Sequence, residues 1–249
     1  AVPFGDTGSV GIGGITLAGG LGFLVRQHGL TIDSLLAAEI VTADGELHRV
    51  DAENEPDLFW AIRGGGGNFG VATRFRYRLH PVETVTGGML ILPATPETVT
   101  GFIEAAREAP EALSAIANVM PAPPMPFIPA HRHGEPIIFA MLVHASGGEA
   151  GERAMAPFRA LASPIVDRIG AMRYPEIFMD EPDGPPIAFT TRTGYVDDID
   201  RDAVATTLDA LGASTAMMKA LQIRVLGGAM ARVPAGETAR LDIEFAQDH

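Results

Sequence analysis

Cysteine is absent from the 249 residues, which excludes disulfide bonds, thiol nucleophiles, thiolate metal ligands and cysteinyl links to a cofactor. Lysine occurs once, at Lys219, while arginine is common, and we interpret this as genomic base-composition bias. No apolar run reaches the ~18 residues that a membrane-spanning helix needs. Residues 1–5 lack the basic-then-apolar order of a signal peptide, so we expect a cytoplasmic protein, although a chain without cysteine fits any compartment.

Positive charge is also scarce, because the formal net charge is −13. This balance argues against nucleic acid and against anionic membrane surfaces as partners, since both need clustered Lys and Arg. The acidic runs at residues 180–183 and 197–200 are typical of solvated loops and of a helix start. A hydrophobic content of 47% and a mean hydropathy of +0.18 indicate a globular chain of one large or two small domains.

The first third of the chain mixes glycine-rich turns with short regular elements. Asp44-Gly45 between apolar runs predicts a hairpin, and the alternation in residues 71–79 predicts a strand with arginines on one face. The expected elements are loop and turn with short extended pieces over 1–22, a helix over 23–28, strands over 35–42 and 47–51, a helix over 55–63 and a strand over 71–79.

A boundary is expected near residues 80–85, which divides the chain into domains 1–82 and 83–249. The expected elements after it are strands over 89–92, 137–143 and 221–226, helices over 97–107, 149–162 and 198–211, a proline-rich loop over 121–129 and an extended segment over 186–195. The spacing is not that of βαβ units. It predicts an α+β fold whose second part is an antiparallel sheet with helices on one face.

Two glycine clusters, within residues 11–22 and 64–70, are the most informative feature. Such density indicates backbone in unusual conformations, or backbone lying against a flat or charged group such as a large planar cofactor. Gly65, Gly67 and Gly70 match G-x-G-x-x-G, but a helix precedes them and a strand follows, which is the reverse of a dinucleotide fingerprint. A sharp chain reversal and the close approach of a ligand both remain open for this cluster.

Other chemical motifs are weak or missing. His131 and His133 lack a third ligand nearby, so we expect an exposed loop and no metal site. The nucleophile elbow of α/β-hydrolases and the phosphate-binding P-loop do not occur. Arg63 serves either a bound phosphate or carboxylate, or the carboxyl end of the preceding helix.

Seven segments of the chain form a pattern that is known from one family. They are Val10-Gly-Ile-Gly-Gly14, Gly19-Gly-Leu-Gly22, Arg26-Gln-His-Gly-Leu-Thr-Ile-Asp33, Val41-Thr-Ala-Asp-Gly45, Asp57-Leu-Phe-Trp-Ala-Ile-Arg-Gly-Gly-Gly-Gly-Asn-Phe-Gly-Val71, Arg78-Leu-His-Pro81 and Leu226-Gly-Gly-Ala-Met-Ala-Arg-Val-Pro234. In these segments the chain resembles the FAD-linked oxidases of the vanillyl-alcohol oxidase superfamily, in the branch of berberine bridge enzyme and 6-hydroxynicotine oxidase. The resemblance is dense over residues 1–81 and thin but colinear over 82–239.

This resemblance implies part of a PCMH-type FAD-binding domain followed by a substrate-binding sheet, with FAD as cofactor and a small molecule as substrate. The chemistry implied is hydride transfer to flavin N5 with reoxidation by O₂. A loop over residues 7–14 would lie near the flavin ring and ribityl chain, and Gly70-Val71 would lie toward the adenosine. The cofactor-binding residues so implied are Thr7, Ser9, Val10, Gly11, Gly13, Gly14, Gly70 and Val71.

The chain also departs from the family pattern. Thr7 stands where bicovalent members have cysteine, and Ile15 stands where some members have histidine. The phosphate-binding half of the FAD domain and the C-terminal tyrosines have no counterpart, so we expect the middle of a longer protein, completed by further polypeptide or by a homodimer. No catalytic base is assigned, and Tyr174, Tyr195, Arg232 and Glu244 are each interpreted as structural.

Three functions follow, in order of preference. The first is an FAD-dependent oxidase of a small alcohol, amine or sugar-like substrate. The second is a non-catalytic binding or scaffold protein that keeps the fold without flavin, since the phosphate loop is missing. The third is a hydrolase or metal enzyme.

Overall fold

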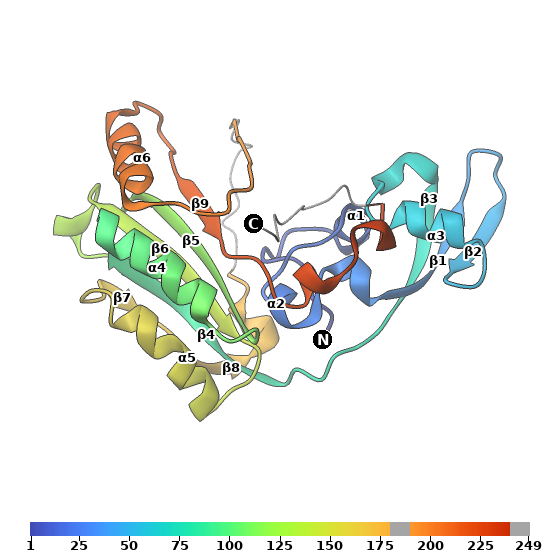
Figure 1. Ribbon diagram of the computed structural model, residues 1–249, viewed down its shortest axis with the longest axis horizontal. Coiled ribbons are helices and arrows are strands. Elements are labelled where there is room, and N and C mark those ends of the chain that lie inside the picture. The colour runs from blue at the N-terminus through green and yellow to red at the C-terminus, as the bar shows by residue number, and fades with distance from the viewer. Residues whose placement is uncertain (180–189, 240–249) are drawn as a thin grey trace. The chain divides into compact units, whose positions relative to one another are not determined.

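The structure is a computed structural model that describes residues 1–179 and 190–239 (Figure 1). The chain forms two compact units. The first contains residues 1–81 with the described parts of 178–197 and 227–249, and the second contains 82–177 and 198–226. The first unit therefore includes segments that the expected division at residues 82 and 83 assigns to the second domain, and that division remains a prediction.

A three-stranded antiparallel sheet forms the centre of the first unit. Its strands are β1 (Leu35–Val41), β2 (Leu47–Asp51) and β3 (Val71–Tyr77), in the order β2-β1-β3. The turn between β1 and β2 has Gly45 at φ 84° and Asp44 Oδ1 accepting from the Glu46 N–H at 3.1 Å, which confirms the expected hairpin.

One face of this sheet is covered by short helices. These are α1 (Ile12–Ala18) and α3 (Pro56–Ile62). The other short elements of this part of the chain are α2 (Val25–His28) and the 3₁₀ turns η1 (Thr31–Ser34) and η2 (Gly66–Phe69). The apolar core between helices and sheet contains Leu35, Ala38, Ile40, Val50, Phe59 and Ile62, packed against Leu17, Phe75 and Tyr77 among others.

The expectation of loop over residues 1–22 is wrong, because α1 lies within it. Glycine costs about 1 kcal/mol in a helix interior, and that penalty underlies the expectation. Packing overrides it here. Thr16 is fully buried and its hydroxyl lies 2.8 Å from the Tyr77 hydroxyl, while Leu17 packs against the core.

A six-stranded, wholly antiparallel sheet forms the second unit. Its strands are β4 (Thr84–Pro93), β5 (Leu113–Pro121), β6 (Pro136–His144), β7 (Val166–Asp167), β8 (Gly170–Arg173) and β9 (Leu221–Arg224). They follow the order β7-β4-β6-β5-β9, and β8 also pairs with β4. The α+β class and the antiparallel second sheet are confirmed, whereas β5, β7 and β8 were not expected.

Three helices cover one face of this second sheet, as expected (Figure 1). They are α4 (Pro96–Glu108), α5 (Glu149–Arg159) and α6 (Arg201–Ala213), and their apolar sides share one core with Leu90, Ala140 and Leu142 of the strands. Asp200 caps α6, since its Oδ1 accepts from the Ala203 N–H at 2.7 Å. The acidic run 197–200 is therefore a helix start, and the run 180–183 lies outside the described residues.

The remaining short elements are 3₁₀ turns: η3 (Ala130–Arg132), η4 (Tyr174–Ile177), η5 (Met230–Arg232) and η6 (Ala235–Glu237). Of the extended segment expected at 186–195, residues 186–189 lie outside the described part and residues 190–195 join neither sheet. None of the helices in the described residues is both long and apolar enough to cross a membrane.

Candidate functional site

The two glycine clusters meet within the first unit. The Gly64 N–H donates to the Leu17 carbonyl at 3.0 Å, and α1 packs against η2. Residues 7–14 form the loop that enters α1 together with its first turn, and Gly70 and Val71 stand where η2 gives way to β3. Hydrogen bonding between neighbouring backbones therefore brings the two clusters together.

The backbone of the first cluster is exposed at the start of α1. Ser9, Val10, Gly11 and Gly14 are exposed, and no side chain caps the N-terminus of α1. A Cβ added at Gly11 or Gly14 would meet no atom within 4 Å. The first N–H groups of a helix have no partner inside it, so this turn presents open donors with no side chain in front of them. Thr7 is half-buried, with its hydroxyl 3.3 Å from Asp6 Oδ1.

The second cluster is partly a packing requirement. Gly70 has φ 152°, and a Cβ there would lie 2.4 Å from the Val41 carbonyl oxygen. A Cβ at Gly65 would lie 2.4 Å from the Ala61 carbonyl oxygen. Gly67, by contrast, faces open space. The structure thus favours the sharp chain reversal for Gly65 and Gly70, and leaves Gly67 free to face a ligand.

Both glycine clusters also carry exposed apolar side chains. Val10, Ile12, Phe69 and Val71 are all exposed, and Val71 is 69% exposed. Apolar surface beside unpartnered N–H donors suits a flat group with polar edges. The residues present therefore fit the part of FAD that the resemblance assigns to them.

Arg63 interacts with protein groups. Its Nε donates to the Phe59 carbonyl at 3.4 Å and its Nη2 donates to the Glu237 carbonyl at 2.8 Å. The guanidinium also lies 4.5 Å from the centroid of the Phe59 ring. Burial lowers its pKa, and the nearby Glu237 opposes that shift. These contacts favour the second of the two expected roles of Arg63, which is interaction with the carboxyl end of helix α3 and not with a bound phosphate or carboxylate.

The other singled-out residues do not form a site. His131 is exposed within η3, and His133 Nε2 lies 3.0 Å from the Ile128 carbonyl. No cluster of three metal-ligating side chains occurs in the described residues. Tyr174 is buried, Tyr195 is exposed and Arg232 lies in η5, while Glu244 lies outside the described residues.

A polar row on the second sheet was not anticipated. Gln222 Nε2 donates to Asn118 Oδ1 at 2.9 Å, and Arg224 Nε donates to Gln222 Oε1 at 2.9 Å. This row borders the sheet face opposite the helices, which is otherwise apolar and includes Met89 and Phe139. The alternation of polar and apolar residues in β9 is the signal that points to it.

Comparison with known proteins finds FAD-linked relatives. Residues 1–51 match the FAD binding domain family. An FAD-linked oxidoreductase of Dictyostelium discoideum is 28% identical over 234 residues, which cover 91% of this chain and 49% of the relative. The (R)-6-hydroxynicotine oxidase of Paenarthrobacter nicotinovorans is 31% identical over 173 residues, covering 68% of this chain and 36% of that enzyme.

Solved structures agree with these matches. The 6-hydroxy-D-nicotine oxidase of Arthrobacter nicotinovorans superposes with a TM-score of 0.63 at 28% identity, over 71% of this chain and 38% of that one. Berberine-bridge-enzyme-like protein 1 of Physcomitrella patens gives 0.73 at 22% identity, over 96% and 54%, and shows the fold alone. The chain spans about half the length of the Dictyostelium relative and 36% of the (R)-6-hydroxynicotine oxidase.

The cofactor expected from the resemblance, FAD, is confirmed by the domain match and by the relatives. The chain is homologous to FAD-linked oxidoreductases, among them 6-hydroxynicotine oxidase, in agreement with its resemblance to the vanillyl-alcohol oxidase superfamily.

Proposed function

We propose that this chain is part of an FAD-dependent oxidase of a small alcohol, amine or sugar-like substrate. The observation that carries the proposal is the open backbone at Gly11 and Gly14, which lies within the segment 1–51 that matches the FAD binding domain family and meets the second glycine cluster through the Gly64–Leu17 hydrogen bond. When FAD is bound, the chemistry it supplies is acceptance of a hydride at flavin N5, with O₂ as the proposed final acceptor.

The chain's own contribution at this site is a set of fixed donors. The N–H groups at the start of α1, from Gly11 to Gly14, would donate to the edge of the flavin ring where negative charge develops on reduction. Donors that are already in place when charge develops stabilise it most effectively. Thr7, Ser9 and Val10 would lie along the same edge, and Gly70 and Val71 toward the adenosine.

The sheet of the second unit would hold the substrate. Its apolar face excludes water, and the Asn118–Gln222–Arg224 row supplies both donors and acceptors. A small molecule with an apolar body and one hydroxyl or amino group would be matched by this combination. The division of labour between residues 1–82 and 83–249 is part of the proposal.

Anaerobic mixing tests the function. The protein is loaded with FAD and mixed with panels of alcohols, amines and oligosaccharides, and the visible flavin absorbance is followed. The proposal expects bleaching by members of one panel and recovery on admission of air, with hydrogen peroxide formed. Bound flavin that dithionite bleaches, but that no member of any panel bleaches, would favour a binding protein without catalysis.

A further inference from the structure

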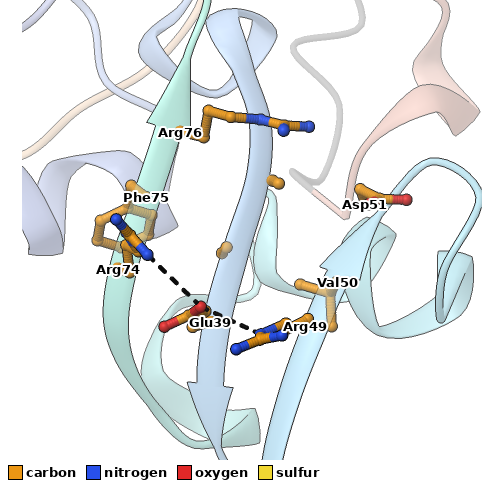
Figure 2. A pocket seen from close by; sticks show the side chains of 9 residues that line it. Glu39, Arg49, Val50, Asp51, Arg74, Phe75 and Arg76 are labelled. Carbon is orange, nitrogen blue, oxygen red and sulfur yellow. Dashed lines mark hydrogen bonds and ion pairs between the residues drawn. The ribbon is translucent and has the colours of Figure 1, made fainter.

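The sheet of the first unit has a second face, opposite to α1 and α3. The side chains of Ala38, Ile40, Val50 and Phe75 point into the core. Residues adjacent to them in sequence belong to the other face, where a pocket of about 230 Å³ is lined by Ala37, Glu39, Arg49, Asp51, Arg74 and Arg76 together with Ala38, Val50 and Phe75 (Figure 2). The polar residues of this lining are Glu39, Arg49, Asp51, Arg74 and Arg76.

Strand register explains the hollow. Ala37 of β1 pairs with Asp51 on one side and with Arg76 on the other. Glu39 likewise stands between Arg49 and Arg74. Cross-strand partners on one face lie about 5 Å apart, so the small methyl group of Ala37 leaves a gap between the side chains of Asp51 and Arg76.

The arginine side chains of this pocket have more N–H donors than the neighbouring carboxylates can accept. The Glu39 carboxylate is shared, since its Oε1 lies 3.3 Å from Arg49 Nε and 3.9 Å from Arg74 Nη1. Each guanidinium carries five N–H donors, so both keep most of theirs available. The side chain of Arg76 makes neither a hydrogen bond nor an ion pair with any residue that the structure describes.

Asp51 is already occupied on its own turn. Its Oδ1 accepts from the backbone N–H groups of Glu53 and Asn54 at 2.9 and 2.8 Å, and the Asn54 side chain donates to both of its oxygens. These bonds, the one from the Asn54 side chain first, lower the pKa of Asp51. Arg76 therefore interacts with the charge of Asp51 electrostatically, without a hydrogen bond between the two side chains.

We propose that this pocket binds a small organic oxyanion, a phosphate ester or a carboxylate, through the guanidinium groups of Arg74 and Arg76, with Arg49 on the opposite side. The planar fork of arginine matches both oxyanions in a bidentate manner. The pocket carries three arginines against two carboxylates on a chain whose net charge is −13, so attraction is confined to short range. This site is separate in chemistry from the flavin site, and its failure would leave the proposed function intact.

Isothermal titration tests the proposal, with inorganic phosphate and citrate as separate probes at low ionic strength. Binding of either probe is expected, and the tighter one identifies the oxyanion. Arg76→Gln should weaken binding at least tenfold. Ala37→Leu should weaken it similarly by filling the hollow without changing charge. The control is Arg153→Gln, an equal charge change on the exposed face of α5, which should bind as the wild type does.

Two results would overturn the proposal. One is the absence of measurable heat with both probes in a sample whose circular dichroism is that of the folded protein. The other is equal binding by wild type, Arg76→Gln and Ala37→Leu, which would make the arginines a ladder of surface ion pairs and nothing more.

Discussion

The imidazole rings of His28 and His80 stack with their centroids 4.0 Å apart and an interplanar angle of 18°. His28 ends α2, and His80 follows β3, where its Nε2 lies 3.0 Å from the Ser34 hydroxyl. Burial, then the charge of His80 and the N-terminal amino group, lowers the pKa of His28 to about 4. Burial, the amino group and Arg78 lower the pKa of His80.

This pair predicts acid sensitivity. The ordinary pKa of histidine is about 6.5, so between pH ~6.5 and ~4 the unfolded chain binds a proton at residue 28 that the folded chain does not. Stability must therefore fall as pH drops through that window. Thermal unfolding at pH 7.5 and 4.5 should show a smaller acid shift for His28→Gln than for wild type. His131→Gln, at an exposed position, is the control and should lose as much thermal stability between the two pH values as the wild type does. If His131→Gln and His28→Gln lost the same amount, the acid sensitivity would not come from His28.

Gly70 is required by its conformation. Its φ is 152°, and a methyl group added there would lie 2.4 Å from the Val41 carbonyl oxygen, so Gly70→Ala should destabilise the first unit by about 1–3 kcal/mol. Gly67→Ala, in open space, is the matched control and should change stability by about 0.5 kcal/mol or less. Urea unfolding measures both, and equal midpoints for the two variants would refute the packing argument.

Thr16 ties α1 to β3. Its hydroxyl lies 2.7 Å from the Ile12 carbonyl and 2.8 Å from the Tyr77 hydroxyl, and burial raises the pKa of Tyr77. Thr16→Val leaves the half-buried Tyr77 hydroxyl without this partner and should cost about 1 kcal/mol. Thr206→Val removes a similar bond, to the Asp202 carbonyl, from an exposed position. The two variants are compared by urea unfolding, and a larger cost for Thr206→Val would contradict the role of Tyr77.

The core of the second unit depends on an aromatic pair. Phe102 of α4 and Phe158 of α5 meet edge to face with centroids 5.1 Å apart, and both are almost fully buried. Phe158→Ala should destabilise the second unit by about 3–5 kcal/mol. Met217→Ala removes a fully exposed side chain and should have almost no effect. Chemical unfolding followed by circular dichroism separates them, and equal stability of the two variants would contradict the role of the pair.

Local patterns predicted the elements whose signals are strong. The Asp44-Gly45 hairpin, the arginine face of β3 and the amphipathic α4 all follow from period or turn chemistry. The helix α1 did not, because its stability comes from the contact of Thr16 with Tyr77, 61 residues away. Nor did β5, whose Ala115 and Ala117 carry weak strand preference and are fixed by pairing with β6.

Only part of the candidate site could be predicted from the sequence, because the rest depends on contacts between residues that are distant in sequence. Glycine density identified both segments, but the distinction between Gly65 or Gly70 and Gly67 depends on atoms of β1 and α3. Arg63 could be assigned only once Glu237 lay beside it, and no spacing in the sequence brings these two residues together. The Asn118–Gln222 pair likewise joins strands that are 104 residues apart.

The most direct test of the flavin site is an FAD titration of this chain and of two glycine variants, followed by flavin absorbance and fluorescence. Gly14 and Gly212 both lie in helices, and a Cβ added at either position would meet no atom within 4 Å. The account predicts FAD uptake by wild type and by Gly212→Val, and at least tenfold weaker uptake by Gly14→Val. Equal uptake by all three, or no uptake by the folded wild type, would contradict it.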